Sequence, residues 1–432
     1  MFHLGWFTNP QPNAWAPETG DPWGGRDGEP ERWQSGEFYV DMARALDRAC
    51  FDYLMLEDHV VVTSMHDPVP RLDPVTLVPL LARETTGLGL IATVSTSFTH
   101  PFGLARTFSS LDHLTGGRVG WNIVTTSEQS AAQAYGMDRL PPHDERYERA
   151  DEFVELATQL WDGWEPDAVV ATPERYVDPA KVHPVDFEGR WYRSKGLLNS
   201  ARPPQGRPVI CQAGTSDRGR EFAARWAETI LVAASAEDDI GFMKDIRNDV
   251  RARAAAAGRD PDEISVMYMV EPILGETEEI ARERKRLRNR PTDEKVHRIL
   301  TMMTKYGEHD LFAYDLDSPL PPGIDASTSE GHRSTFGNFL RLGRDGTRTL
   351  REMCGAYNHD CVELVGTPAS VAERMGEVMA AVGGDGFLLY GRPLTRHYIT
   401  EITEGLVPEL QRRGLTRTSY AGRTLREHLR ES

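Results

Sequence analysis

The sequence predicts a single α/β domain built as a (β/α)8 TIM barrel, and three observations lead to this fold class. Eight short apolar segments, each typical of a buried strand, alternate with segments whose apolar residues recur at helical spacing. Such alternation indicates a parallel sheet. The chain has 432 residues, which is long for one ordinary core but compatible with a barrel that carries insertions. We therefore expect one barrel domain over residues 1–432.

The eight predicted strands follow one another along the whole chain. They are His3–Thr8, Tyr53–Asp58, Gly87–Thr96, Arg118–Thr125, Arg207–Gly214, Glu228–Ala234, Ile264–Leu274 and Asp385–Tyr390. Helical spacing of apolar residues predicts the intervening helices at 36–50, 74–85, 101–114, 144–164, 216–227, around Arg253, and at 368–384. Asp73 followed by Pro74 is typical of a helix start, because the carboxylate caps the first turn and proline fits its first position.

Two segments interrupt the alternation and are predicted to be insertions. Residues 173–206 are rich in proline and aromatic residues and have the pattern of a hairpin. Residues 292–351 contain the loop-like stretch SPLPPGIDASTSEGHRST. Because long insertions in compact domains are often functional, the second one is our candidate for a lid.

Composition excludes several classes of partner. The formal net charge of −17 argues against binding to nucleic acid or to anionic membranes. No stretch approaches about 18 uninterrupted apolar residues, so we expect no membrane span. The N-terminus lacks signal-peptide features, and the four cysteines form no CxxC pair, so we expect a cytoplasmic protein without disulfides. Cys50 and Cys211 lie in apolar segments and are interpreted as small core residues.

Polar residues gather where the predicted strands end. The carboxyl ends of barrel strands meet at one face, where chemistry occurs in this fold. No HExxH or paired Cys/His spacing is present, so no metal site is expected. The strand-end residues are Glu57, Asp58 and His59; Thr93, Ser95 and Thr96; Asn122, Thr125 and Thr126; Gln212, Ala213, Gly214, Thr215 and Ser216; and Tyr390 with Arg392.

Two motifs near these ends have alternative interpretations. AGTSDRGR (Ala213–Arg220) places small residues between a strand and a helix, which leaves backbone N–H groups for a phosphate; the alternative is an ordinary helix cap by Ser216. In HDERY, His143 and Tyr147 share one face of a helix start and could both donate to an anion; the alternative is a solvated helix end.

One apparent nucleotide-binding motif is rejected. GLGLIA (Gly87–Ala92) fits the pattern GxGxxA, but that fingerprint needs its glycines between a strand and a helix. Here strand-like residues follow, and no helix is predicted until Pro101. We therefore expect no pyridine-nucleotide site.

Several long blocks carry a family resemblance, in the same order as in known proteins. They are GLGLIATVSTSFTHPFGLARTFSSLDHLTGGRVGWNIVTT, AYGMDRLPPHDERYERADEF, KVHPVDFEGRWYR, RPPQGRPVICQAGTSDRG and VPELQRRGLTRTSYAGRTLREHL. Together they resemble flavin-dependent monooxygenases of the bacterial luciferase-like superfamily, in the branch of the nitrilotriacetate, dibenzothiophene-sulfone and dimethylsulfide monooxygenases. Long-chain alkane monooxygenase and pristinamycin synthase are similar too.

The resemblance implies a two-component enzyme. Reduced FMN would come from a separate NAD(P)H:FMN reductase, and O2 would be the co-substrate that oxygenates a small organic molecule through a flavin C4a-(hydro)peroxide. It implies a homo-oligomer, a dimer or a tetramer. The alternatives are an F420-dependent oxidoreductase of the same fold and a non-catalytic flavin-binding homologue.

The resemblance also assigns cofactor-binding residues. Asp58, Asn122 and a hydroxyl of Thr93 or Ser95 would contact the flavin, with Thr125 beside them. His143 and Tyr147 would lie near the ribityl chain and the phosphate, and the phosphate would be held by Ala213, Gly214, Thr215 and Ser216. His59 and His143 are candidate proton handles, although histidines often serve structure alone. Trp121 is expected to point away from the barrel by strand alternation.

One segment departs from the family pattern. Relatives often carry a His-containing stretch with Ala-Trp-Arg soon after the first strand, whereas this chain has TNPQPNAWAPETGDPWGG, with Trp15 but neither that His nor that Arg. That loop lines the substrate side in the family, so the resemblance does not identify the substrate.

Overall fold

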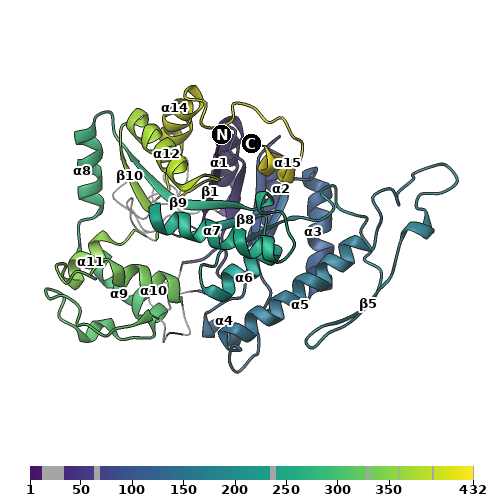
Figure 1. Ribbon diagram of the computed structural model, residues 1–432, viewed down its shortest axis with the longest axis horizontal. Coiled ribbons are helices and arrows are strands. Elements are labelled where there is room, and N and C mark those ends of the chain that lie inside the picture. The colour runs from purple at the N-terminus through teal and green to yellow at the C-terminus, as the bar shows by residue number, and fades with distance from the viewer. Residues whose placement is uncertain are drawn as a thin grey trace.

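A closed barrel of eight parallel strands forms the centre of the computed structural model (Figure 1). The structure describes residues 1–11, 34–62, 69–233, 240–326, 329, 332–358, 360–391 and 394–431. Neighbouring strands pair in parallel around the ring, and the last strand pairs back with the first. The strands are β1 (His3–Thr8), β2 (Tyr53–Leu56), β3 (Gly89–Ser95), β4 (Val119–Val124), β7 (Val209–Gln212), β8 (Thr229–Val232), β9 (Ser265–Leu274) and β11 (Gly386–Leu389). The predicted (β/α)8 barrel is confirmed, and these strands are the eight predicted.

Helices cover the outside of the barrel. The Asp73 carboxylate accepts hydrogen bonds from the backbone N–H groups of Val75 and Thr76, so the predicted helix start is confirmed. The outer helices are α1 (Glu37–Arg48), α2 (Pro74–Ala82), α3 (Pro101–Thr115), α5 (His143–Asp162), α6 (Asp217–Trp226), α7 (Ile240–Ala256) and α12 (Pro368–Val382). The C-terminal region adds α13 (Arg396–Thr400), the π-helix η7 (Glu401–Leu406) and α14 (Val407–Arg412).

Strand alternation divides the core into an outer and an inner layer. Trp121 of β4 is fully buried in the outer layer and packs against Phe108 of α3 and Phe153 of α5, as predicted. The inner layer fills the barrel with Tyr53, Met55, Ile91, Val209, Cys211, Leu231, Met267, Met269 and Leu388. The next residue of β4, Asn122, therefore faces the barrel interior.

The C-terminal helix α15 (Leu425–Arg430) closes the end of the barrel where the strands begin. Leu425 and Leu429 are buried in the inner layer, and Figure 1 shows the two chain ends close together there. A Cβ on Gly89, the first residue of β3, would lie 2.5 Å from Leu425 Cδ1, so glycine is required for this close approach. With this end plugged, only the carboxyl ends of the strands can open into a site.

Outside the predicted loop-like stretch, the insertion at 292–351 is largely helical. It contains α9 (Asp293–Gly307), the 3-10 turn η5 (Leu311–Ala313), α10 (Arg333–Arg341) and α11 (Leu350–Ala356), and it follows α8 (Glu278–Arg288). These helices bury a hydrophobic cluster of their own that includes Ile299, Phe336, Phe339 and Met353. The irregular part of the insertion lies between η5 and α10. In this part, residues 327–328 and 330–331 are outside the described residues.

Two of the elements that were not predicted are short. Strand β10 (Val362–Gly366) pairs with the second half of β9, from Val270 to Leu274, outside the ring. Helix α4 (Gln129–Ala134) follows β4. Both are too short, at five and six residues, to show a clear period in the sequence.

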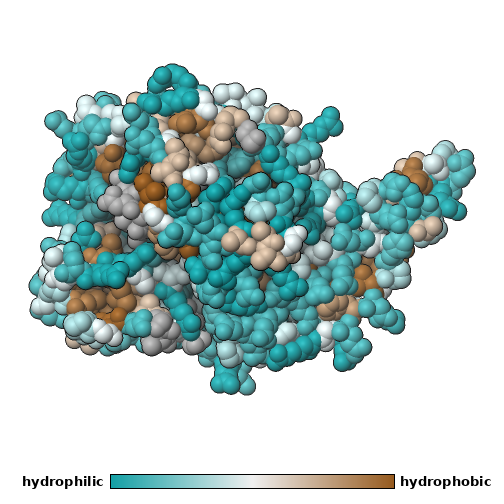
Figure 2. Space-filling model, viewed as in Figure 1, coloured by the Kyte–Doolittle hydropathy of each residue, from teal (hydrophilic) through white to brown (hydrophobic). Residues whose placement is uncertain are grey.

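The insertion at 173–206 forms an arm that projects from the rounded body (Figures 1 and 2). After the 3-10 turn η3 (Pro179–Lys181), strands β5 (Val185–Glu188) and β6 (Arg193–Gly196) pair antiparallel, so the predicted hairpin is confirmed. The Glu152 carboxylate of α5 accepts the backbone N–H groups of Arg190, Trp191 and Tyr192 and so holds the hairpin turn on the body.

All four cysteines are free thiols. Cys211 is fully buried inside the barrel, as predicted. Cys50 is only half-buried and has a φ of 62°, so its interpretation as a core residue is wrong. In the described ranges, no helix combines the length and the apolar character needed to cross a bilayer.

Candidate functional site

A cavity of about 870 Å³ opens at the carboxyl ends of the strands, between the barrel and the helical insertion. This volume suits a cofactor together with a small ligand. Every residue that the sequence predicted for the cofactor lines it, from four strand ends and two helix starts: Asp58, Thr93, Ser95, Asn122, Thr125, His143, Tyr147, Ala213, Gly214, Thr215 and Ser216. His59 and Tyr390 line it as well, whereas Trp15 and Arg392 lie outside the described residues.

The floor of the cavity carries polar side chains with unused hydrogen-bonding capacity. Asn122 and Thr93 face each other in register on β4 and β3, and Asn122 Nδ2 donates to Thr93 Oγ1 at 2.9 Å. In the described part of the chain, Asn122 Oδ1 and Gln212 Oε1 are buried without a hydrogen-bond partner. Since buried acceptors are normally satisfied, these two atoms are suited to donors on a ligand.

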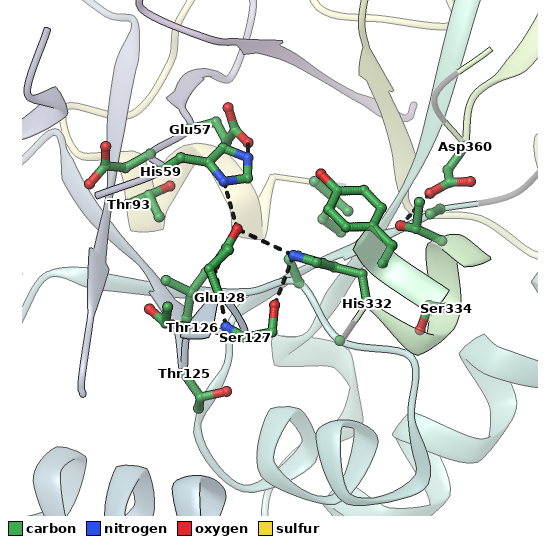
Figure 3. Close-up of a pocket in the computed structure, with 18 of the residues that line it drawn as sticks. Glu57, His59, Thr93, Thr125, Thr126, Ser127, Glu128, His332, Ser334 and Asp360 are labelled. Carbon is green, nitrogen blue, oxygen red and sulfur yellow. Dashed lines mark hydrogen bonds and ion pairs between the residues drawn. The ribbon is translucent and has the colours of Figure 1, made fainter. Parts of the chain in front are cut away.

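A chain of charged side chains links the floor to the insertion (Figure 3). Arg71 contacts Glu57 at 2.7 Å, Glu57 contacts His59 Nε2 at 2.7 Å, and His59 Nδ1 contacts Glu128 at 2.8 Å. The same Glu128 oxygen lies 3.4 Å from Nε2 of His332, which is the residue before α10. Of these side chains, only His59 is a candidate functional residue from the sequence.

The pKa shifts of His59, Glu57 and Glu128 all favour their charged forms. Burial alone would lower the pKa of His59, but Glu57 and Glu128 outweigh it and raise the value to about 10. Burial would raise the pKa of the Glu57 carboxyl, but His59 and Arg71 hold this pKa low. Burial would likewise raise the pKa of the Glu128 carboxyl, but His332 and His59 hold it well below its ordinary value. His59 is therefore an imidazolium at pH 7, a fixed positive charge rather than a base.

Asp58, beside this chain, has the opposite environment. It makes no hydrogen bond within the described residues, and burial together with the charges of Asp73 and Glu57 raises its pKa to about 6. A carboxyl group with such a pKa can gain or lose a proton near neutral pH.

The turn between β7 and α6 forms the second polar end of the cavity. Ser216 Oγ accepts the backbone N–H of Gly219 at 3.1 Å, so Ser216 is a helix cap, as one of the two interpretations held. A hydroxyl that accepts from the backbone still has its own proton to donate, so the cap is compatible with an anion at this turn. A Cβ on Gly214 would lie 2.3 Å from Gln212 Nε2 and 2.9 Å from Tyr147 Oη, which explains the glycine.

The start of α5 lies beside this turn. Tyr147 is buried and its ring is 5.1 Å from that of His143, so the two side chains share one face as predicted. His143 is half-buried and its Nδ1 lies 2.7 Å from Asp144. The alternative of a fully solvated helix end is therefore wrong for Tyr147.

The insertion forms the roof of the cavity. One face of α9 lines it, at helical spacing, with Glu294, His297, Arg298, Thr301, Met302 and Lys305. The first turn of α10 lines it with His332, Arg333, Ser334 and Thr335. None of these residues is predicted from the sequence, because the position of the insertion relative to the barrel has no local signal. Within the described residues, no group of three or more His, Cys, Asp or Glu side chains could hold a metal ion.

Comparisons with known proteins agree with this architecture. The family model described as luciferase-like monooxygenase matches residues 3–386. The chain is 37% identical to N-acetyl-S-(2-succino)cysteine monooxygenase of Bacillus subtilis (strain 168), over 91% of this chain and 89% of that protein. It is 35% identical to dibenzothiophene-sulfone monooxygenase of Rhodococcus erythropolis, over 91% and 90%. A crystal structure of riboflavin lyase (RcaE) with modified FMN and riboflavin superposes with a TM-score of 0.84 at 31% identity, over 100% and 96% of the two chains.

Proposed function

The chain belongs to the luciferase-like monooxygenase family, and from this premise we propose that it is the oxygenase component of a two-component system. It would take reduced FMN from a separate NAD(P)H:FMN reductase and use O2 to oxygenate a small organic substrate. The observation that carries the proposal is the gathering of all the predicted cofactor residues around one cavity at the barrel mouth.

The residues of the cavity fit FMN at both of its ends. At the turn after β7, Ser216, Thr215 and the backbone at the start of α6 offer donors for a phosphate. The unpartnered oxygens of Asn122 and Gln212 are acceptors for ring or ribityl donors. When bound, reduced FMN would supply the two electrons that activate O2 for transfer of one oxygen atom to the substrate.

The side chains of this protein would hold and enclose the reactants. The chain of side chains from Arg71 to His332 fixes the His59 imidazolium at the cavity wall, where it is paired with the carboxylates of Glu57 and Glu128. The helical insertion lines the mouth of the cavity and would limit the access of water to it. Asp58 is the group that could exchange a proton near neutral pH.

Purified protein is expected not to oxidise NADH by itself. The segment GLGLIA, which fits a nucleotide fingerprint, continues into strand β3 and does not form a strand-to-helix turn. Absorbance at 340 nm should stay constant with protein, FMN and NADH, and should fall, with oxygen uptake, once a flavin reductase is added. Rapid NADH oxidation without the reductase would contradict the two-component proposal. Activity with F420 instead of FMN would favour the alternative oxidoreductase.

The Ser216→Ala variant is expected to bind FMN more weakly by about 1.5–3 kcal/mol, because it loses a charge-assisted donor to the phosphate. It also loses its helix cap, which lowers stability by about 1 kcal/mol. Binding should be titrated with reduced FMN and reduced riboflavin, since riboflavin lacks the phosphate. Equal losses for the two flavins would place Ser216 away from the phosphate.

A further inference from the structure

We propose that the first turn of α10 supplies the second half of the cofactor phosphate site, with Arg333 as its charge partner and Ser334 as a hydrogen-bond donor. The inference rests on the proposed function. It means that the phosphate lies between the barrel and the insertion and is closed from both sides.

The geometry at this point joins two segments that are far apart in sequence. Ser334 Oγ lies 3.2 Å from Thr215 Oγ1, which belongs to the turn between β7 and α6. Arg333 and Ser334 line the same cavity as that turn. Helix α10 has no side-chain hydrogen bond at its N-cap, His332, so its first N–H groups are not covered by a capping side chain. The starts of α6 and α10 therefore meet at one place.

The charge distribution of the cavity agrees with an anion there. The pKa of Asp144 is lowered, first by the hydrogen bond from His143 and further by the charges of Arg218 and Arg333, and of these two arginines Arg333 lines the cavity. Glu57 and Glu128 also line the cavity, but their charges are paired with His59 and Arg71. A phosphate dianion would be attracted to the guanidinium of Arg333.

A second observation points to the kind of ligand. Gln212 is 2% exposed, and its amide nitrogen lies beside Gly214. Gly214 belongs to the same turn as Thr215, whose hydroxyl lies 3.2 Å from that of Ser334. Its Oε1 has no partner within the described residues. An unpartnered acceptor that lines the same cavity as Arg333 suits a hydroxyl group of the same ligand as the phosphate, as in a sugar or polyol phosphate.

Two further contacts hold α10 in this position. The Ser127 hydroxyl is 2.8 Å from His332 Nε2, and the Thr335 hydroxyl donates to the Asp360 carboxylate at 2.8 Å. Figure 3 shows His332, Ser334 and Asp360 on the insertion side, across from Ser127 and Glu128. The first turn is thus held on either side of Arg333 and Ser334, by the loop after β4 and by the segment before β10.

The test is the affinity of the full-length protein for two reduced flavins, measured anaerobically by fluorescence. Arg333→Gln should weaken binding of reduced FMN by about ten- to a hundredfold and leave reduced riboflavin within about twofold. Arg333→Lys should recover part of the loss because it keeps the charge. Ser334→Ala should show a smaller loss, also specific for FMN. Arg344→Gln is the matched control, because Arg344 is an exposed arginine of the same insertion that does not line the cavity.

The outcomes separate this inference from the proposed function. The phosphate assignment is wrong if Arg333→Gln and Ser334→Ala both change the affinities for the two reduced flavins equally, or change neither. In that case the proposed function still stands, provided that the wild type binds reduced FMN. Failure of the wild type to bind either reduced flavin overturns both. Amide hydrogen exchange in α10 gives a second readout: FMN should slow it and riboflavin should not, and equal protection by both would count against the proposal.

Discussion

At pH 6 the Glu128→Gln variant is expected to be less stable than the wild type by about 3 kcal/mol. Glu128 is 8% exposed and joins His59 to His332, so the substitution leaves a buried imidazolium with one carboxylate instead of two. Removing one partner of a buried ion pair costs this much because the remaining charge stays desolvated. Urea unfolding at pH 6 measures the loss.

The pH dependence of this difference tests its cause. The pKa of Glu128 is lowered from 4.5 in the folded protein, so its contribution is present above pH 4.5 and disappears as the pH falls through the folded value. The pKa of His59 is raised from 6.5 to about 10, so its contribution is complete below pH 6.5 and is lost as the pH rises toward 10. The deficit should therefore be largest between pH 4.5 and 6.5.

A matched control is Glu148→Gln. Glu148 is also paired, with Arg190 at 3.2 Å, but both side chains are more than half exposed. Exposed pairs contribute about 0–1 kcal/mol, so this variant should differ little from the wild type. Similar losses in the two variants would contradict the view that Glu128 owes its effect to burial within the charged chain.

The Asp58→Asn variant is expected to lose activity while gaining stability. Product formed per reduced FMN should fall about tenfold, with more hydrogen peroxide released, if the carboxylate orients or protonates a bound group. Because the raised pKa of Asp58 means that its ionised form destabilises the fold, a neutral amide should stabilise the protein by about 1–3 kcal/mol at pH 8. This gain should vanish below pH 3.8, where the wild-type carboxyl is protonated in both states.

The pH profile distinguishes a role in the reaction from a role in the fold. Wild-type activity should change with an apparent pKa near 6, and this limb should be absent in Asp58→Asn. Asp138→Asn, an exposed aspartate before α5, is the control and should leave both profiles unchanged. Unchanged coupling together with a lower melting temperature would assign Asp58 to the structure alone.

Strand ends made much of the site predictable. Asp58, Asn122 and Thr215 lie within three residues of the ends of β2, β4 and β7, and parallel strands of a barrel end on the same face. Recognising the strands was therefore enough to bring these residues together. Strand alternation likewise predicts that the side chains of Trp121 and Asn122 point to opposite faces of the sheet.

The roof of the cavity could not be predicted in this way. Glu128 lies four residues beyond β4 with nothing in its neighbours to indicate burial, and His332 lies in an irregular stretch between η5 and α10. They meet only because the insertion packs its own cluster around Phe336 and Phe339 and then docks on the mouth. Neither residue carries a local pattern that specifies its partner.

The barrel, its eight strands and the polar residues at their ends could be predicted from the sequence, because apolar periodicity and chain order are local properties. It also contained the blocks that resemble flavin-dependent monooxygenases. Three features required the structure: the insertion is a helical roof, Asp58 and His59 have opposite environments, and the start of α10 approaches the turn at Thr215. The physical reason is that burial and electrostatic coupling depend on distances between segments, and those distances are set by packing of the whole chain.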